Sequence, residues 1–215
     1  MNNFARMNAA KKITIIDYGM GNLASIKNLI KKIGGEAEIT NNIEKINVAE
    51  KIILPGVGAF NKAMANLREL QFIEILNKKV LVDKIPLMGI CLGMQLLTNY
   101  SEEGNCEGLG WIDAKTIKFK FENNTVKVPH MGWTDVNLTM PEHSIFREIK
   151  DTPRYYFVHS YYVQCASPKN TIAQSIYQHP FDCGIAKDNI IGFQFHPEKS
   201  HKFGMQLMHN FIHYF

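Results

Sequence analysis

Hydrophobic residues in the first half of the chain follow two alternating patterns. Short apolar runs at 12–17, 51–54 and 86–90 are typical of buried strands, and apolar residues at three-to-four spacing after them are typical of helices. Helices are expected at 23–33, between Gly58 and Leu67, at 72–82 and at 94–99, with an edge strand at 37–40. This strand–helix order predicts an α/β fold with a mostly parallel central sheet flanked by helices.

The second half of the chain has a different pattern of hydrophobic residues. Short runs rich in β-branched and aromatic residues predict strands at 116–121, 125–128, 134–138, 155–163, 172–175, 185–187 and 190–195, and a last helix is expected at 202–214. These strands predict a β-rich, mixed or antiparallel portion joined to the parallel sheet. We assign 1–11 to an N-terminal extension and 12–215 to a single domain, because no linker or repeat interrupts it.

Composition excludes several classes of function. The chain has 215 residues, 46% of them hydrophobic and 20% charged, which is ordinary for a globular protein. Its net charge of +4 is scattered along the chain, so nucleic acid is not an expected partner. No apolar run approaches a membrane span. The four cysteines show no CxxC spacing, so we expect no metal, no cofactor and a cytoplasmic location.

The first motif that carries chemistry is Gly89-Ile-Cys-Leu-Gly93, between a predicted strand and a predicted helix. Glycines on both sides permit the sharp turn of a nucleophile elbow, which exposes the central Cys91. The start of a helix favours a thiolate there, and the backbone N–H of Leu92 can bind an oxyanion. Taken alone, these residues would suit a buried structural cysteine equally well.

The second motif is Gly192-Phe-Gln-Phe-His196-Pro-Glu198, which follows a predicted strand. A thiolate enzyme needs a base to take and return a proton, and a third group to hold that base. His196 and Glu198 are two residues apart, so they share a side of an extended segment that Pro197 stiffens. The chain has 8 histidines, so His196 alone would be an ordinary structural histidine.

The third motif, Pro55-Gly-Val-Gly58, also follows a predicted strand. Two glycines allow backbone N–H groups to face an anion, although a plain tight turn is the commoner use of such residues. Ligands bind beyond the carboxyl ends of parallel strands. We therefore expect all three motifs to converge on one cleft.

Together these segments resemble the class I (triad) glutamine amidotransferases, whose fold is flavodoxin-like, and among them the glutaminase subunits of imidazole glycerol phosphate synthases. The matching motifs follow the family's order from about residue 12: Ile16-Asp-Tyr-Gly-Met-Gly-Asn-Leu23, Leu54-Pro-Gly-Val-Gly-Ala-Phe60, Gly89-Ile-Cys-Leu-Gly-Met-Gln-Leu-Leu97, Ser101-Glu-Glu-Gly104, Val128-Pro-His-Met-Gly-Trp133, Tyr156-Phe-Val-His-Ser-Tyr161 and Gly192-Phe-Gln-Phe-His-Pro-Glu-Lys-Ser200. The whole class shares the Cys91 and His196–Glu198 motifs. The Pro129–Trp133 and Phe157–Ser160 runs are more specific.

The resemblance implies a role for each matching residue. Cys91 attacks the side-chain amide of glutamine, His196 acts as base and then acid, and Glu198 orients His196. The oxyanion would be held by the backbone N–H groups of Val57 and Leu92. The implied substrate-binding residues are Gly56, Gly58, Gln95, His159, Ser160 and Tyr161. The residues implied at or near a partner interface are Asn22, His130 and Trp133.

The resemblance also implies a partner and a pathway. Ammonia would pass to a (β/α)₈ cyclase/synthase subunit in a heterodimer, which forms imidazole glycerol phosphate and AICAR in histidine biosynthesis. The segment His201–Gln206 resembles relatives that supply a sugar-modifying amidotransferase in surface polysaccharide synthesis, which is the alternative acceptor. Two further alternatives are a free-standing cysteine hydrolase and an inactive subunit. The presence of Gln95 and Glu198 argues against the first, and the complete triad argues against the second.

Overall fold

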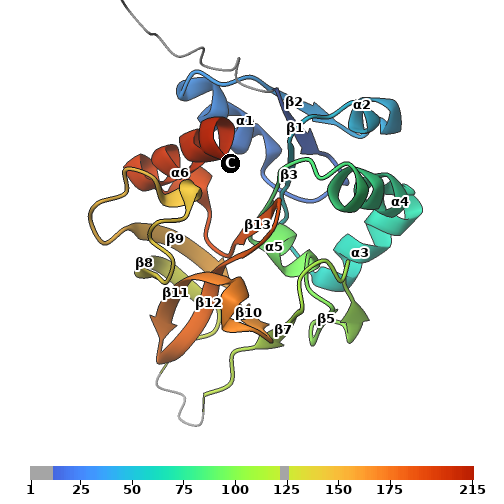
Figure 1. The fold of residues 1–215 in the computed structure, drawn as a ribbon. Helices are drawn as coiled ribbons and strands as arrows, with labels where there is room; N and C mark the ends of the chain where they lie inside the picture. Colours follow the sequence, from blue (N-terminus) through green and yellow to red (C-terminus); the bar gives the residue numbers. More distant parts are fainter. Residues whose placement is uncertain (1–11, 122–125) are drawn as a thin grey trace, which may run out of the picture.

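Five parallel strands form the half of the sheet that carries the predicted motifs. The computed structural model describes residues 12–121 and 126–215 (Figure 1), so the predicted extension at 1–11 lies outside the described residues. The strands run in the order β2–β1–β3–β4–β13. Their bounds are Ile13–Ile16 for β1, Ala37–Thr40 for β2, Ile52–Leu54 for β3, Leu87–Ile90 for β4 and Ile190–Phe193 for β13. The parallel central sheet is confirmed, with β2 at its edge as expected.

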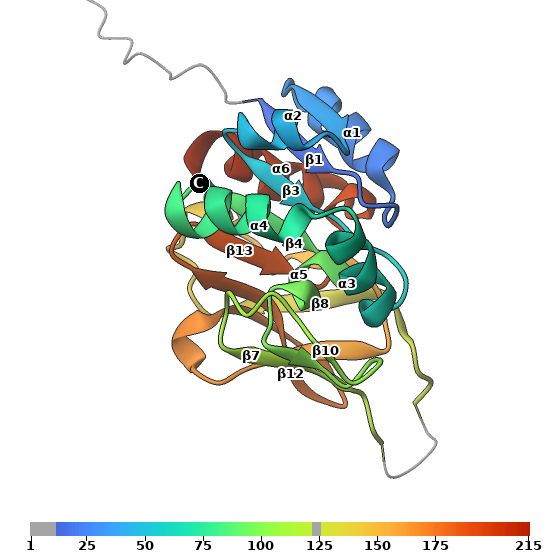
Figure 2. The same ribbon diagram turned by 90° about the vertical axis from the view of Figure 1, so that its right-hand side faces the viewer.

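Helices cover both faces of these strands, as Figures 1 and 2 show. On one face lie α1 (Leu23–Lys32) and α6 (His201–Tyr214); on the other lie α3 (Phe60–Glu69), α4 (Phe72–Asn77) and α5 (Leu92–Leu96). Successive strand residues point to opposite faces of the sheet. Ile15 therefore belongs to the buried cluster that includes α1 and α6, and Ile16 to the cluster that includes α3, α4 and α5. The strand–helix alternation read from the sequence thus produces a two-faced core.

The β-rich half continues from β13 by antiparallel pairing. Next to β13 comes β12 (His179–Lys187), followed by β10 (Tyr161–Cys165), β7 (Ala114–Lys118), β5 (Tyr100–Ser101) and β6 (Cys106–Glu107). A branch leaves β12 through β11 (Thr171–Tyr177) to β8 (His130–Leu138) and β9 (Arg154–His159). The mixed and antiparallel portion is therefore confirmed. Short 3₁₀ turns lie at Ser144–Phe146, Pro168–Asn170 and Pro197–Lys199.

Several boundaries differ from the sequence-based prediction. The predicted strand at 155–163 is divided at Ser160, where the chain passes from β9 to β10. Of the predicted strand at 125–128, residue 125 lies outside the described residues, and 126–128 form no strand. The adjoining Pro129 cannot donate to a ladder. The strand β12 is much longer than the predicted strand at 185–187. The sequence pattern did not reveal its first residues, because Pro180 and Gly184 interrupt the run of strand-forming residues.

The helices also differ in detail. The predicted helix at 72–82 is α-helical only to Asn77 and continues as a π-helical turn, Lys78–Val82. The helix predicted at 94–99 is α5, which begins earlier, at Leu92. A short helix α2, Ile43–Asn47, was not predicted, because five residues are too few to show a helical period.

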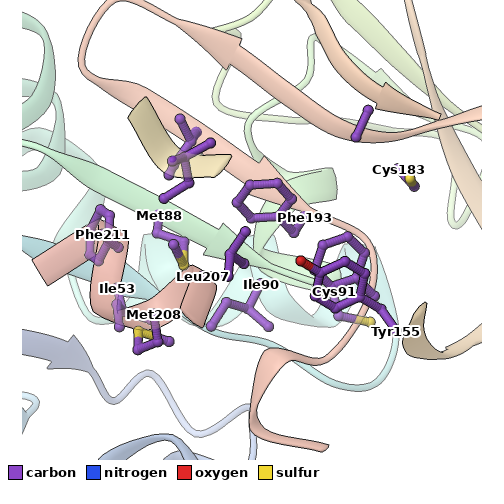
Figure 3. Packing of buried hydrophobic residues seen from close by; sticks show 14 of the residues in the cluster. Ile53, Met88, Ile90, Cys91, Tyr155, Cys183, Phe193, Leu207, Met208 and Phe211 are labelled. Atoms are coloured by element: carbon purple, nitrogen blue, oxygen red, sulfur yellow. The ribbon is translucent and has the colours of Figure 1, made fainter. Parts of the chain in front are cut away.

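A buried cluster holds the two strands that lead into the predicted nucleophile and base. Met88 and Ile90 of β4, Phe193 of β13, and Leu207 and Phe211 of α6 belong to this cluster and are at most 1% exposed. Figure 3 shows β4 side chains packed between β13 and α6, with Cys91 at the end of the strand. Interiors packed in this way deform little. The ends of β4 and β13 are therefore rigid supports for the site.

Candidate active site

Cys91 stands on a strained turn between β4 and α5. Its φ is 53° and its ψ is −109°, a conformation that residues with a side chain rarely adopt. The backbone N–H of Cys91 donates to the carbonyl of Phe193 over 2.7 Å, which ties the turn to the end of β13. Strain of this kind persists only where the surroundings enforce it, often at functional sites. The geometry is that of the predicted elbow.

Glycines make this turn possible, as the sequence predicts. A Cβ at Gly93 would lie 1.8 Å from the carbonyl oxygen of Leu54, and one at Gly89 would lie 2.7 Å from the carbonyl oxygen of Gly93. Neither position can accept a side chain without movement of the backbone. The two glycines therefore let α5 pass directly over the ends of β3 and β4.

His196 and Glu198 meet as the second motif predicts. Nδ1 of His196 lies 2.8 Å from Oε1 of Glu198, and their side chains are 2% and 1% exposed. The carboxylate accepts from Nδ1–H, which directs Nε2 to the cavity as the free position of the ring. Nε2 is buried and has no hydrogen-bond partner among the described residues. The backbone N–H of His196 donates to the carbonyl of Tyr156, which anchors the segment to β9.

The surroundings of His196 favour its charged form. Burial acts to lower the pKa of His196, but the interactions with its neighbours Cys91 and Glu198 together outweigh burial and raise this pKa to about 10. The imidazolium form of His196 is therefore favoured at neutral pH, on the same cavity that Cys91 lines. A thiolate–imidazolium pair is the reactive form of cysteine nucleophiles.

The three motifs converge on one cavity of about 310 Å³, a volume suited to a small ligand. Its lining brings together most of the predicted site residues: Val57, Gly58, Cys91, Leu92, Gln95, His159, Ser160, Tyr161 and His196. Leu92 is the first residue of α5, so its N–H has no partner within the helix. That N–H is available to an oxyanion beside Cys91.

Gly56 is an exception among the predicted substrate-binding residues. It does not line the cavity, and a Cβ there would lie 2.6 Å from the Tyr18 hydroxyl and 2.8 Å from Cβ of Leu92. The Tyr18 hydroxyl donates to the carbonyl of Pro55 over 2.6 Å. The lack of a side chain at Gly56 lets the Pro55–Gly58 loop pack against Tyr18 and α5. A contact of Gly56 with substrate stays a prediction.

Glu103 lines the cavity and was not singled out from the sequence. Its Oε2 accepts from the backbone N–H of Phe60 over 2.8 Å, which orients the carboxylate. A carboxylate in such a cavity is the natural partner of a substrate ammonium group. The Ser101-Glu-Glu-Gly104 motif was the available signal, but nothing in its local spacing indicates that Glu103 reaches the cavity.

The residues predicted to face a partner occupy different environments. Asn22 is exposed at the start of α1, and Trp133 is 39% exposed with its ring stacked on that of His201 at 5.2 Å. His130 is only 3% exposed, with its ring stacked between Phe157 and Tyr177. The side chain of His130 is therefore interior in this conformation, and its place at or near a partner interface stays a prediction.

A larger hollow of about 600 Å³ lies elsewhere, lined by β8, residues 149–154 and part of β11. Its lining contains no histidine or cysteine, so the larger hollow is not the one that holds the candidate nucleophile and base. In the ranges 12–121 and 126–215, no group of three or more His, Cys, Asp or Glu side chains is placed to hold a metal ion. Nor does any helix in these ranges have the length and apolarity needed to cross a membrane.

Comparison with known proteins agrees with this geometry. The family whose model matches residues 14–214 is described as "Glutamine amidotransferase class-I". The chain belongs to this family and is a glutamine amidotransferase.

Two relatives are similar over almost their whole length. The chain is 58% identical to "Imidazole glycerol phosphate synthase subunit HisH 2" of Methanococcus maripaludis, over 93% of this chain and 98% of that protein. It is 47% identical to the protein of the same description from Pseudomonas aeruginosa, with the same coverage.

Among solved structures, the fold is similar to a chain of "Structure of PurLQS from Thermotoga maritima", with a TM-score of 0.75 at 16% identity, covering 96% of this chain and 99% of that chain. A second, "Crystal structure of glutamine amidotransferase", has a TM-score of 0.72 at 17% identity and covers 92% and 96%. At these identities the likeness concerns the fold.

Proposed function

We propose that this chain is the glutaminase subunit of an imidazole glycerol phosphate synthase. It hydrolyses glutamine to glutamate and ammonia, and the ammonia passes to a (β/α)₈ cyclase/synthase partner that forms imidazole glycerol phosphate and AICAR in histidine biosynthesis. The observation that carries the chemistry is that Cys91 and His196 line one cavity, while Glu198 lies behind His196 with Oε1 2.8 Å from its Nδ1. The pathway is supported by relatives of that description at 58% and 47% identity.

The reaction follows from the geometry of the charged pair. The thiolate of Cys91 attacks the side-chain amide carbon of glutamine, and the backbone N–H groups of Leu92 and Val57 stabilise the oxyanion. His196, already protonated, gives its proton to the departing nitrogen, and ammonia leaves. The neutral imidazole then takes a proton from water, which cleaves the thioester to glutamate. Glu198 holds Nδ1 of His196 throughout.

The cavity supplies complementary groups for the rest of glutamine. The carboxylate of Glu103 suits the α-ammonium group. Both hydrogens of Gln95 Nε2 are used, on the Tyr161 carbonyl and on Gln194, so a contact of Gln95 with substrate falls to its Oε1 acceptor. The peptide segment from His159 to Tyr161 also lines the cavity and would bind the α-carboxylate through its N–H groups.

Apolar side chains around the cavity favour a partner that covers it. Val57, which lines the cavity, is 43% exposed. Val128 and Met131 flank the lining residue Pro129 and are 38% and 66% exposed. Exposed apolar residues gathered at one site commonly mark an interaction surface. The four free cysteines suit a cytoplasmic location for such a complex.

The test is a glutaminase assay of the chain with a cyclase barrel, with and without the phosphoribulosyl-formimino aminoimidazole nucleotide. We expect strong stimulation by barrel and nucleotide together, and loss of at least about a thousandfold in Cys91→Ser. Cys106→Ser is the matched control, because Cys106 does not line the cavity. Absence of stimulation by the barrel would reject the histidine-pathway assignment, and full activity of Cys91→Ser would reject the nucleophile.

A further inference from the structure

Two buried glutamine side chains connect the backbone of the cavity to the nucleophile. Nε2 of Gln95 donates to the carbonyl oxygen of Tyr161 and to Oε1 of Gln194, in both cases over 3.0 Å. Nε2 of Gln194 lies 3.7 Å from Sγ of Cys91, a distance at which N–H can donate to sulfur. Gln95 is 5% exposed and Gln194 is fully buried. The result is a continuous hydrogen-bonded path from Tyr161 to Cys91.

The orientation of both amides follows from the Tyr161 carbonyl. A carbonyl oxygen can only accept, so Gln95 must turn its Nε2 towards it. The second hydrogen of the same Nε2 then requires an acceptor, which places Oε1 of Gln194 there and its Nε2 at Cys91. A flip of either amide would bring two oxygens or two N–H groups together. The path therefore presents a donor to the sulfur and cannot present an acceptor.

A donor in this position matters because the Gln194 side chain is fully buried. A buried amide N–H without an acceptor is costly, and a thiolate is a far better acceptor than a thiol. We propose that Gln194 is a positioning residue for the glutaminase reaction: its amide donates to the Cys91 thiolate, stabilises the anion and keeps Sγ directed into the cavity. This inference rests on the proposed function, because it assigns a role within the same site.

Gln95 and Gln194 differ in a way that an experiment can use. Gln95 lines the cavity, whereas Gln194 does not. Replacement of Gln194 should therefore change the reactivity of Cys91 and spare the binding of glutamine. In kinetic terms, kcat should fall while KM stays nearly constant.

The decisive variants are Gln194→Met and Gln194→Glu, assayed in the complex with its partner. Methionine keeps the length of the side chain and removes the donor, so we expect kcat to fall roughly 10- to 100-fold. Glutamate can still accept from Gln95 but places an acceptor at the sulfur, so kcat should fall further. Gln164→Glu is the matched control, because Gln164 is exposed on β10, away from the cavity.

A second readout separates positioning from a purely structural role. The rate of alkylation of Cys91 by iodoacetamide, followed by mass spectrometry from pH 5 to 10, needs neither partner nor glutamine. We expect slower alkylation in Gln194→Met and a profile displaced to higher pH in Gln194→Glu. A folded Gln194→Met protein with kcat within about twofold of wild type and an unchanged alkylation profile would overturn the inference. If Gln194→Glu does not fold, the methionine variant decides.

Failure of this inference and failure of the proposed function give different results. If the wild-type complex hydrolyses glutamine and alkylation of Cys91 abolishes that activity, the function stands even when Gln194→Met behaves as wild type. If the wild-type complex is inactive, or stays active after Cys91 is alkylated, the proposed function fails first.

Discussion

Nδ1 of His130 lies 3.0 Å from Nε2 of His159, and the neighbouring hydrogen bonds determine which of the two nitrogens is the donor. Nδ1 of His159 lies 2.8 Å from the Tyr161 carbonyl oxygen and must donate to it. In the neutral ring, Nε2 of His159 then accepts from Nδ1–H of His130. Nε2 of His130 in turn accepts from the Thr134 hydroxyl over 2.9 Å. A pair of neutral histidines thus supports the same carbonyl that orients Gln95.

This pair should make the protein less stable in acid. Burial lowers the pKa of His130 to about 4. Burial also lowers the pKa of His159, to about 3. The hydrogen bond to Tyr161 opposes this second shift, and the charges of His130 and His196 add to it. The unfolded chain binds these protons near pH 6.5, so it gains them before the folded protein does. Stability should therefore fall, by on the order of a few kcal/mol, as pH drops from about 6.5 towards 4.

Urea denaturation at a series of pH values measures this loss. His130→Gln should be less stable at pH 7 but should show a shallower decline below pH 6.5. His201→Gln is the control, because His201 is exposed. An equally steep decline in a folded His130→Gln protein would show that this histidine does not contribute to the acid sensitivity.

The charge of Glu198 should contribute, together with Cys91, to the alkaline limit of glutaminase activity. His196 must be protonated to release ammonia, and its raised pKa of about 10 places the loss of kcat/KM in that region. Glu198→Gln removes a charge that raises this pKa, so the limit should move to lower pH and kcat should fall at least about 100-fold. The pH dependence of kcat/KM in the complex measures both.

The control for this experiment is Glu107→Gln, because Glu107 is exposed on β6. The apparent values belong to the coupled pair of Cys91 and His196 and are read as such. A Glu198→Gln variant whose alkaline limit coincides with that of wild type would contradict the assignment of Glu198.

Gly93 should tolerate no side chain. In Gly93→Ala the new Cβ would lie 1.8 Å from the Leu54 carbonyl, so β3 and α5 would have to separate. We expect a loss of roughly 3 kcal/mol or more in the free energy of unfolding, or failure to fold. Urea denaturation followed by circular dichroism provides the measurement.

Gly34→Asn is the matched control for that variant. Gly34 has a positive φ of 83°, which asparagine tolerates, and a Cβ there meets nothing within 4 Å. It should lose at most about 1 kcal/mol. Equal stability of the two variants would indicate that the elbow adjusts more freely than its packing implies.

Lys51 should be a major contributor to stability. Its side chain is buried at the start of β3, and Nζ donates to the carbonyl oxygens of Phe211 and Ile212 at 2.6 and 3.0 Å, in the last turns of α6. Lys51→Met keeps the apolar stem but leaves these carbonyls without that donor. We expect about 3 kcal/mol of destabilisation, because hydrogen bonds from a charged group are among the stronger ones.

The control is Lys62→Met, since Lys62 is exposed on α3. It should change the free energy of unfolding by less than about 0.5 kcal/mol. If both variants unfold at the same urea concentration as wild type, Lys51 does not stabilise the end of α6.

Local features of this protein were readable from the sequence. The elbow around Cys91 depends on glycines within two residues of it, and the His196–Glu198 contact spans only two residues. The strand–helix order of the first half likewise follows from local hydrophobic spacing. Strands interrupted by proline and glycine, such as β12, and helices of one turn, such as α2, were harder, because their patterns are too short or broken.

The sequence by itself determined the strand–turn–helix elements, the family resemblance and the candidates Cys91, His196 and Glu198, because each depends on neighbouring residues. Only the tertiary structure decided that Gln194 meets Cys91, that His130 is interior and pairs with His159, and that Gly56 packs against Tyr18 and Leu92. Such contacts join positions up to about a hundred residues apart. They arise from how β4, β13 and β9 are placed by the shared core, which no local pattern records.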